Sequence, residues 1–208
     1  MITAALLSLA AACPLSDAPP APATDSLRAF WEAGRTWTDF YAAVTRRAAM
    51  WRANYGKGFD DQAELARARG LTGPWRVLIV TVDGCSDSAN TLPYLASLVD
   101  SLGGTIEFRI IDPDRGKGIM EAHRTRDGRP ATATLLLLDQ GWNEVGCWVE
   151  RPSALAHMMA EQRGKLSDDE LLERKFAWYD EDRGRSTVRE FLDMIEHAAP
   201  GAPCGGGA

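Results

Sequence analysis

The run from Trp75 to Val82 restricts the fold of this 208-residue chain more than any other segment. Its apolar residues form a near-continuous, largely β-branched stretch: Val77, Leu78, Ile79, Val80 and Val82. Such a run is typical of a strand that is buried on both faces of its sheet. The chain is therefore expected to fold as an α/β domain with a central sheet flanked by helices.

A crossover helix and further strands are predicted after this run. The helix is indicated by apolar residues at helical spacing that end at a Gly pair: Leu95, Leu98, Val99 and Leu102, then Gly103-Gly104. The next elements are a strand over 106–111, a short helix over 118–124, strands over 134–138 and 144–149 joined by a turn, and a helix from Pro152 to about Arg163. The first two strands, linked by a crossover helix, should be parallel neighbours.

Additional helices are predicted on both sides of this core. Before it lie helices over 26–33 and 60–69 and, between them, one long helix capped by Thr38, whose buried stripe is Phe40, Val44, Ala48 and Trp51. After it lie two helices that each carry a capping-box pattern, Ser167 with Glu170 and Thr187 with Glu190. The expected domain covers 25–198, divided into a helical extension (25–73), a core (74–164) and C-terminal helices (165–198).

Both ends of the chain are expected to lie outside this domain. Residues 2–13 are uncharged and mostly Ala and Leu, too short to span a bilayer, and Ala10-Ala11-Ala12-Cys13 resembles a bacterial lipoprotein cleavage site. A flexible tether then runs to residue 24. This pattern favours a lipid on Cys13 and a place in the bacterial cell envelope, although the leader lacks an initial Lys or Arg, which supports the alternative of a cytoplasmic protein. Residues 199–208, rich in Gly and Pro, predict a disordered tail.

Composition excludes several classes of function. Lys and Arg number 23 and Asp and Glu 29, so the net charge of −6 has the wrong sign for a general nucleic-acid binder. The three histidines have no partner at metal-ligand spacing and there is no glycine-rich phosphate loop, so neither a metal nor a cofactor is expected. The four widely spaced cysteines form no CxxC pair and no disulfide framework. Cys147 is expected to be a core residue and Cys204 an idle thiol in the tail.

Cys85 remains as the candidate reactive cysteine. It lies where the buried strand ends and the amphipathic helix begins, in Asp83-Gly84-Cys85-Ser86-Asp87-Ser88. The unpaired N–H groups and the dipole of a helix N-terminus favour an anion, and therefore the nucleophilic thiolate. The hydroxyl of Ser88, one helical turn on, is expected to donate a hydrogen bond to the sulfur. A negative charge on Asp87 would oppose the thiolate.

The order of elements, with a cysteine at the first strand-to-helix turn, resembles thioredoxin. Several short segments are together similar to a bacterial thioredoxin-like family with a Trp-Cys-Gly-Asp type active site: Trp51 to Tyr55, Cys85 to Ser88 with Pro93, Glu144 to Gly146, Glu150 to Pro152, and Trp178 to Gly184. The resemblance covers about residues 26–198. It implies a thioredoxin-like fold and thiol chemistry at Cys85.

The chain departs from thioredoxin at four positions of that site. Ser88 stands where thioredoxins have the resolving cysteine, and Gly84 where they have Trp. Ile79 occupies the place of the buried acid and Ala133 that of the cis-proline. Because a cis bond before a residue other than proline costs about 3 kcal/mol, the bond between Thr132 and Ala133 is expected to be trans. Peptide docking beside Cys85 would then differ from that of thioredoxin.

A locally basic stretch precedes this position, from Arg115 to Arg129. In a thioredoxin-like fold it borders the active-site turn, so Arg126 or Arg129 would stabilise a thiolate or hold a glutathione-like carboxylate. The alternative, which the charge pattern favours, is a solvated loop.

Two functions fit these features. The first is a monothiol thiol-disulfide oxidoreductase or thiol carrier, in which Cys85 attacks a disulfide and an external thiol resolves the adduct. Its partners would be protein or low-molecular-weight thiols and disulfides. The second is a thioredoxin-fold binding or adaptor module without turnover, which the missing resolving cysteine favours.

Overall fold

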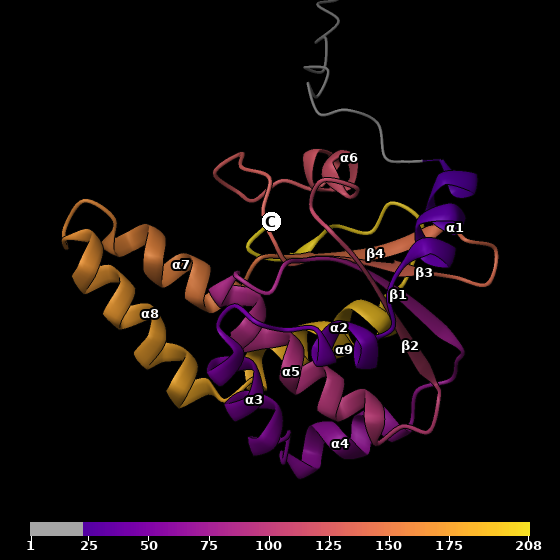
Figure 1. Cartoon of the computed structure of the whole chain (residues 1–208), viewed down its shortest axis with the longest axis horizontal. Helices are drawn as coiled ribbons and strands as arrows, with labels where there is room; N and C mark the ends of the chain where they lie inside the picture. Colours follow the sequence, from indigo (N-terminus) through magenta and orange to yellow (C-terminus); the bar gives the residue numbers. More distant parts are fainter. Residues whose placement is uncertain (1–22) are drawn as a thin grey trace, which may run out of the picture.

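A five-stranded mixed sheet with helices on both faces forms the centre of the structure, a computed structural model that describes residues 23–208 (Figure 1). Its strand order is β2-β1-β3-β4-β5, with these bounds: β1 Trp75–Val80, β2 Ile106–Ile111, β3 Thr134–Leu138, β4 Glu144–Val149 and β5 Gly205–Gly206. Strands β1 and β2 are parallel neighbours, as predicted, while β3 runs antiparallel to β1 and to β4. The predicted α/β fold is confirmed.

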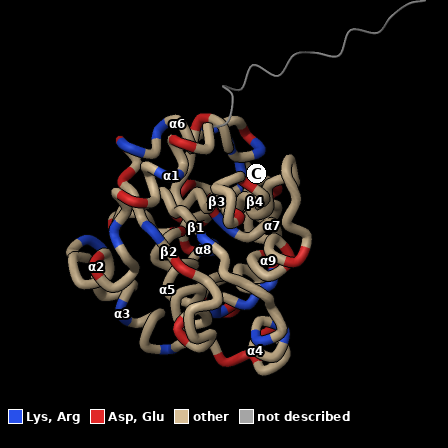
Figure 2. Tube along the Cα trace, turned by 90° about the vertical axis from the view of Figure 1, so that its right-hand side faces the viewer, with Lys and Arg blue, Asp and Glu red and all other residues tan. Residues whose placement is uncertain are grey.

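The helices of the described residues surround this sheet. In chain order they are α1 Thr24–Ala33, α2 Trp37–Ala42, α3 Ala48–Lys57, α4 Gln62–Arg69, α5 Ser86–Asp100, α6 Lys117–Ala122, α7 Ser153–Gln162, α8 Asp168–Asp182 and α9 Arg185–Glu196. Most Lys, Arg, Asp and Glu residues lie on these helices and on the loops (Figure 2). The sheet itself is largely apolar.

Strand β1 is buried on both faces, as its sequence predicts. Val77 and Ile79 point into one apolar cluster, which α5 and α9 cover, and Leu78 and Val80 into a second, which α1 and α6 cover. All four side chains are fully buried. The carboxyl end of β1 therefore delivers the chain to the N-terminus of α5 from the middle of the sheet.

The prediction of one long helix from Thr38 is wrong, because α2 and α3 are separate helices. The Asp83 carboxylate accepts hydrogen bonds from the backbone N–H groups of Thr45 (3.0 Å) and Arg46 (2.7 Å), and Arg47 adopts a left-handed conformation with φ of 51°. These contacts turn the chain between the two helices. The predicted stripe still packs into the core, although Val44 lies in the connection between the two helices.

Only one of the two predicted capping boxes forms. Ser167 and Glu170 cap α8 reciprocally, as predicted. Helix α9 instead begins after Gly184, whose φ is 79°, and Thr187 is buried inside the helix. The Glu190 carboxylate accepts hydrogen bonds from Trp148 Nε1 and from the backbone N–H of Ser153, so tertiary contacts occupy it instead.

The C-terminal segment is ordered, which corrects the prediction of a tail over 199–208. Cys204 forms a disulfide with Cys147 across 57 residues of chain, so Cys147 is a bonded core cysteine and Cys204 is not an idle thiol. Strand β5 adds to β4 in parallel, and the N–H of Gly207 donates to the Val149 carbonyl at 2.7 Å. Backbone hydrogen bonds and one covalent link thus hold a segment whose composition alone predicts disorder.

The proposed lipid attachment at Cys13 lies outside the described residues. Within residues 23–208, every helix is too short or too polar to cross a membrane.

Candidate functional site

Cys85 is placed at the N-terminus of α5 as predicted and is the free cysteine among residues 23–208. Cys85 is half-buried and is the N-cap residue of α5. The sulfur accepts a hydrogen bond from the backbone N–H of Ser88 at 3.4 Å. This donor belongs to the first turn of α5, where N–H groups have no partner within the helix and favour a negative charge.

The hydroxyl of Ser88 does not make the predicted contact with the sulfur. It is fully buried and accepts a hydrogen bond from the Thr81 hydroxyl at 2.7 Å. Ser88 therefore acts on Cys85 through its backbone amide, and its side chain fixes the start of α5 against the end of β1.

The backbone at Thr132 faces Cys85, and the bond between Thr132 and Ala133 is cis, so the predicted trans bond is wrong. The Cys85 thiol donates to the Thr132 carbonyl with a sulfur–oxygen distance of 3.2 Å. Neighbouring contacts hold this segment on both sides, because the N–H of Glu150 donates to the Ala133 carbonyl at 2.7 Å and the Thr134 hydroxyl donates to the Ala131 carbonyl at 2.7 Å. The prediction of a trans bond rests on the free energy of the isolated peptide bond alone, and these tertiary contacts do not enter it.

Gly84 leaves room for an arginine where thioredoxins carry Trp. A Cβ at this position would lie within 2.5 Å of the Arg46 guanidinium carbon, and Arg47 Nε donates to the Gly84 carbonyl at 2.7 Å. Burial would raise the pKa of Asp83, but the N–H groups of Arg46 and Thr45 outweigh it and lower that pKa. The loop before Cys85 is therefore tied to the α2–α3 connection by charge-assisted hydrogen bonds.

Asp87 is buried and compensated rather than a free negative charge beside Cys85. Tyr179 Oη donates to its carboxylate at 2.7 Å, Lys175 Nζ lies at 3.1 Å and Arg151 at 3.3 Å. Lys175 also donates to the hydroxyl of Ser86, the residue after Cys85, at 2.9 Å. We call Asp87, Arg151, Lys175 and Tyr179 the buried quartet; each is less than 10 % exposed.

The quartet is electrically coupled. Burial and the neighbouring Asp87 carboxylate raise the pKa of Tyr179 well above its ordinary value, so the phenol is a fixed hydrogen-bond donor. Burial would lower the pKa of Arg151, but Asp87 and Glu150 outweigh it and raise that pKa. Lys175 and Arg151 thus face the Asp87 carboxylate at the first turn of the helix that carries Cys85, and Arg151 also pairs with the buried Glu150 at 2.6 Å.

Arg129 does not reach the Cys85 sulfur, as it would have to if it stabilised the thiolate. Its guanidinium binds Asp127 at 2.9 Å and Glu150 at 3.4 Å. Of the predicted site residues, the structure brings Ser88 and Thr132 into contact with Cys85, while Asp87 and Arg129 belong to other clusters.

Lys175, Tyr179 and Arg151 were not identified from the sequence as site residues. Lys175 and Tyr179 are four residues apart and lie on one face of α8, yet a Lys and a Tyr at that spacing are common on exposed helices. The sequence signal for these residues is Asp87. A carboxylate beside the apolar stretch of α5 needs cationic or hydrogen-bonding partners if it is buried.

Residues suited to metal binding meet at one place in the described chain. Donor atoms of His123, Cys147 and Cys204 lie within 4.8 Å of one another. Because the two sulfurs are bonded to each other, they are not thiolates, and a cysteine binds zinc only as a thiolate.

Known proteins are similar to this chain in sequence pattern or in fold. A family model described as thioredoxin matches residues 34–165. The crystal structure of PA1234, a protein of unknown function from Pseudomonas aeruginosa, is similar with a TM-score of 0.63 and 20% identity, over 82% of this chain and 96% of that one. An HIV epitope-scaffold crystal structure is similar with a TM-score of 0.64 and 21% identity, over 83% of this chain and 98% of that one. A search of curated proteins finds no match.

Proposed function

The chain belongs to the thioredoxin family, and on this premise we propose that it exchanges thiols with disulfides through the single thiol of Cys85. The thioredoxin-like fold predicted from the sequence is confirmed by the family match and the similar structures. The observation that carries the proposal is the half-buried Cys85 sulfur at the N-terminus of α5, between the Ser88 amide and the Thr132 carbonyl.

The exchange proceeds in two balanced steps. The Cys85 thiolate attacks one sulfur of a partner disulfide, a Cys85–partner disulfide forms, and the other partner sulfur leaves as a thiolate that takes a proton from water. An external thiolate then attacks the mixed disulfide and releases Cys85 as the thiolate. An external thiol is needed because Ser88 occupies the position of the resolving cysteine. Protein or low-molecular-weight thiols and disulfides are the partners.

The chain's own residues support the first step in three ways. The amide of Ser88 hydrogen-bonds the sulfur and favours its anionic form. The quartet balances the charge of Asp87, so this carboxylate opposes the thiolate less than its position suggests. The Thr132 carbonyl holds the protonated thiol in place until it ionises.

A binding or adaptor module without turnover is the second candidate. The hydroxyl of Ser88 is committed to Thr81 and the buried acid of thioredoxins is replaced by Ile79, which is fully buried in the core. In this candidate the Cys85 face would bind a partner without covalent capture.

Covalent capture distinguishes the two candidates. Cys13→Ser is the parent protein, because Cys13 is a second cysteine outside the disulfide and would react as well. Cys13→Ser and Cys13→Ser/Cys85→Ser are incubated with oxidised glutathione or with 5,5′-dithiobis(2-nitrobenzoate), and adducts are measured by intact mass. We expect one thiol-reversible adduct on Cys13→Ser, formed faster than on N-acetylcysteine at the same pH, and none on Cys13→Ser/Cys85→Ser with an unchanged circular dichroism spectrum. An adduct that forms no faster than on N-acetylcysteine would support the adaptor module.

A further inference from the structure

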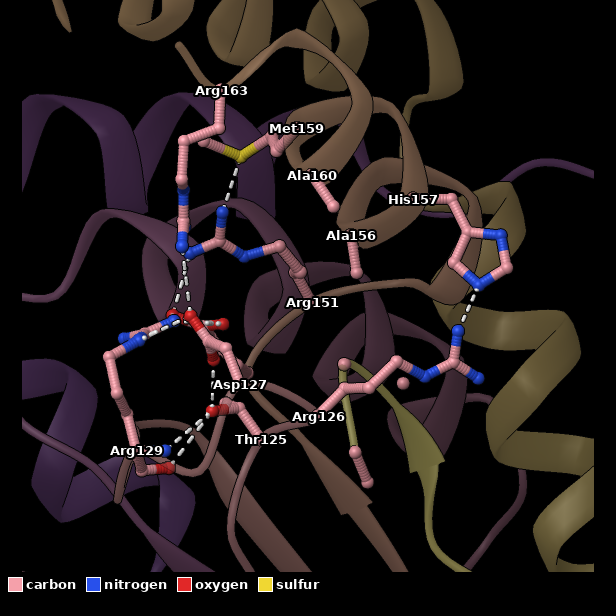
Figure 3. A pocket seen from close by; sticks show the side chains of 14 residues that line it. Thr125, Arg126, Asp127, Arg129, Arg151, Ala156, His157, Met159, Ala160 and Arg163 are labelled. Atoms are coloured by element: carbon pink, nitrogen blue, oxygen red, sulfur yellow. Dashed lines mark hydrogen bonds and ion pairs between the residues drawn. The ribbon is translucent and has the colours of Figure 1, made fainter.

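A pocket lies between the loop over 123–131, helix α7 and the C-terminal segment (Figure 3). Its volume is about 190 Å³. The loop contributes Arg126 and Arg129, α7 contributes His157, and Arg163 follows the end of α7. The backbone of Gly206 and Gly207 forms another wall. None of these groups takes part in the exchange proposed for Cys85.

The pocket is positively charged although the chain is acidic. Its lining side chains include four arginines and two carboxylates, whereas the whole chain has a net charge of −6. Asp127 binds both Arg129 (2.9 Å) and Arg163 (3.1 Å), and hydrogen bonds from Arg129 and Thr125 lower the pKa of Asp127 far below its ordinary value. The acids of the pocket are thus already neutralised by arginines.

Arg126 is the lining arginine that has no carboxylate partner among residues 23–208. Its guanidinium donates to Nε2 of His157 at 2.5 Å, and Figure 3 shows the two side chains meeting at one side of the pocket. An imidazole carries no negative charge, so this hydrogen bond leaves the positive charge of Arg126 uncompensated. Deeper in the pocket, Nε of the buried Arg151 also has no hydrogen-bond partner.

The remaining wall is apolar. Ala156, Met159 and Ala160 of α7 line the pocket and point toward it in Figure 3. A guanidinium with spare donors beside small aliphatic side chains suits a molecule that joins an acidic group to a short carbon skeleton.

We propose that this pocket binds a small organic anion, whose carboxylate or phosphate group is held by Arg126 and whose carbon skeleton packs on α7. His157 positions the guanidinium, and the acidic group of the ligand supplies the negatively charged partner that Arg126 lacks. The pocket shares Arg151 with the buried quartet, but Arg126 and α7 do not contact Cys85, so the proposal does not depend on disulfide exchange by Cys85.

Calorimetric titration of the full chain with two sulfur-free probes, succinate and 3-phosphoglycerate, tests the proposal at matched ionic strength. Wild type should bind at least one probe saturably, and the probe that binds identifies a carboxylate or a phosphate preference. Arg126→Gln should weaken binding about tenfold, a loss of ~1.4 kcal/mol. Arg124→Gln is the matched control, because Arg124 lies on the same loop outside the pocket and pairs with Glu121.

Two results would overturn the site. One is the absence of saturable binding for both probes, and the other is an equal affinity of wild type and Arg126→Gln. As Arg126 is exposed and outside the core, the variant is expected to fold, and its unfolding midpoint in urea checks this. A second variant, Ala160→Trp, fills the pocket from α7 without removing charge and should also weaken binding.

Discussion

Two cysteine sites among residues 23–208 differ in where the sheet places them. Cys85 lies at the carboxyl end of β1, half-buried, with a helix N-terminus on one side and a carbonyl on the other. The Cys147–Cys204 disulfide lies on a face of the sheet, within the apolar cluster that α1 and α6 cover. An end of the sheet exposes backbone donors and admits a partner, whereas a face surrounds sulfur with hydrocarbon. The comparison shows that position relative to the sheet separates a free, half-buried thiol from a structural bond.

The two regions also differ in how charge is buried beside them. Next to Cys85, the buried quartet places two cations on one carboxylate. Next to the disulfide, a single His123–Glu144 pair lies at 2.7 Å. Disturbing the first region should therefore affect both stability and thiol chemistry, and disturbing the second should affect stability alone.

The largest effect is expected from Lys175→Met. Removing one partner from a buried ion pair destabilises a fold by about 3 to 5 kcal/mol, because the other charge stays buried. Urea unfolding measures this loss, and the pH profile of Cys85 alkylation by iodoacetamide should move to higher pH. Lys165→Met, at an exposed lysine just before α8, is the control and should change neither. An unmoved alkylation profile would mean that the quartet is structural only.

Removal of the disulfide should have the next largest effect. The double variant Cys147→Ala/Cys204→Ala is expected to lose about 2 to 4 kcal/mol of unfolding free energy, because the bridge no longer constrains the unfolded chain. The alkylation rate of Cys85 in the folded protein should stay within twofold of wild type, a roughly 0.4 kcal/mol limit. A large fall in that rate would contradict the separation of the two regions.

The smallest effect concerns the pH dependence near the disulfide. Burial would lower the pKa of His123, but its hydrogen bond and ion pair with Glu144 outweigh burial and raise that pKa. A raised folded-state pKa stabilises the fold below the unfolded value near 6.5, and this contribution is lost as pH rises through the folded pKa.

Wild type should therefore lose on the order of 1 kcal/mol of unfolding free energy through His123 as the pH rises above neutrality. His123→Gln should flatten this part of the stability profile, measured by urea unfolding between about pH 6 and about pH 9. His197→Gln, at an exposed histidine, should leave the profile as in wild type. An equal flattening by both variants would show that the pair with Glu144 contributes nothing.

Local pattern was enough to predict the sheet and the place of Cys85. The strands over 106–111, 134–138 and 144–149 have the predicted bounds, since a dense apolar run between turn residues leaves little choice of limits. The position of the free cysteine, Cys85, follows from the end of β1 in the same way. These features depend on residues that are close in the chain.

Contacts between distant residues account for what the sequence did not predict. Lys175 binds Asp87 from 88 residues away, and Cys204 meets Cys147 only because the last residues return to the sheet. The break between α2 and α3 depends on Asp83, 38 residues from Thr45. Propensity and periodicity carry no information on such pairings, so the elements were predictable and their mutual contacts were not.

Strand β5 has a consequence for how copies of the chain meet one another. A bare outer strand offers a row of unpaired N–H and C=O groups on which another chain can add a strand and begin to aggregate. The two residues of β5 occupy that row along the end of β4, at Trp148 and Val149. The last residues of the described chain thus cover backbone groups of β4 with which another chain could pair, and reduction of the Cys147–Cys204 bridge is expected to loosen this cover.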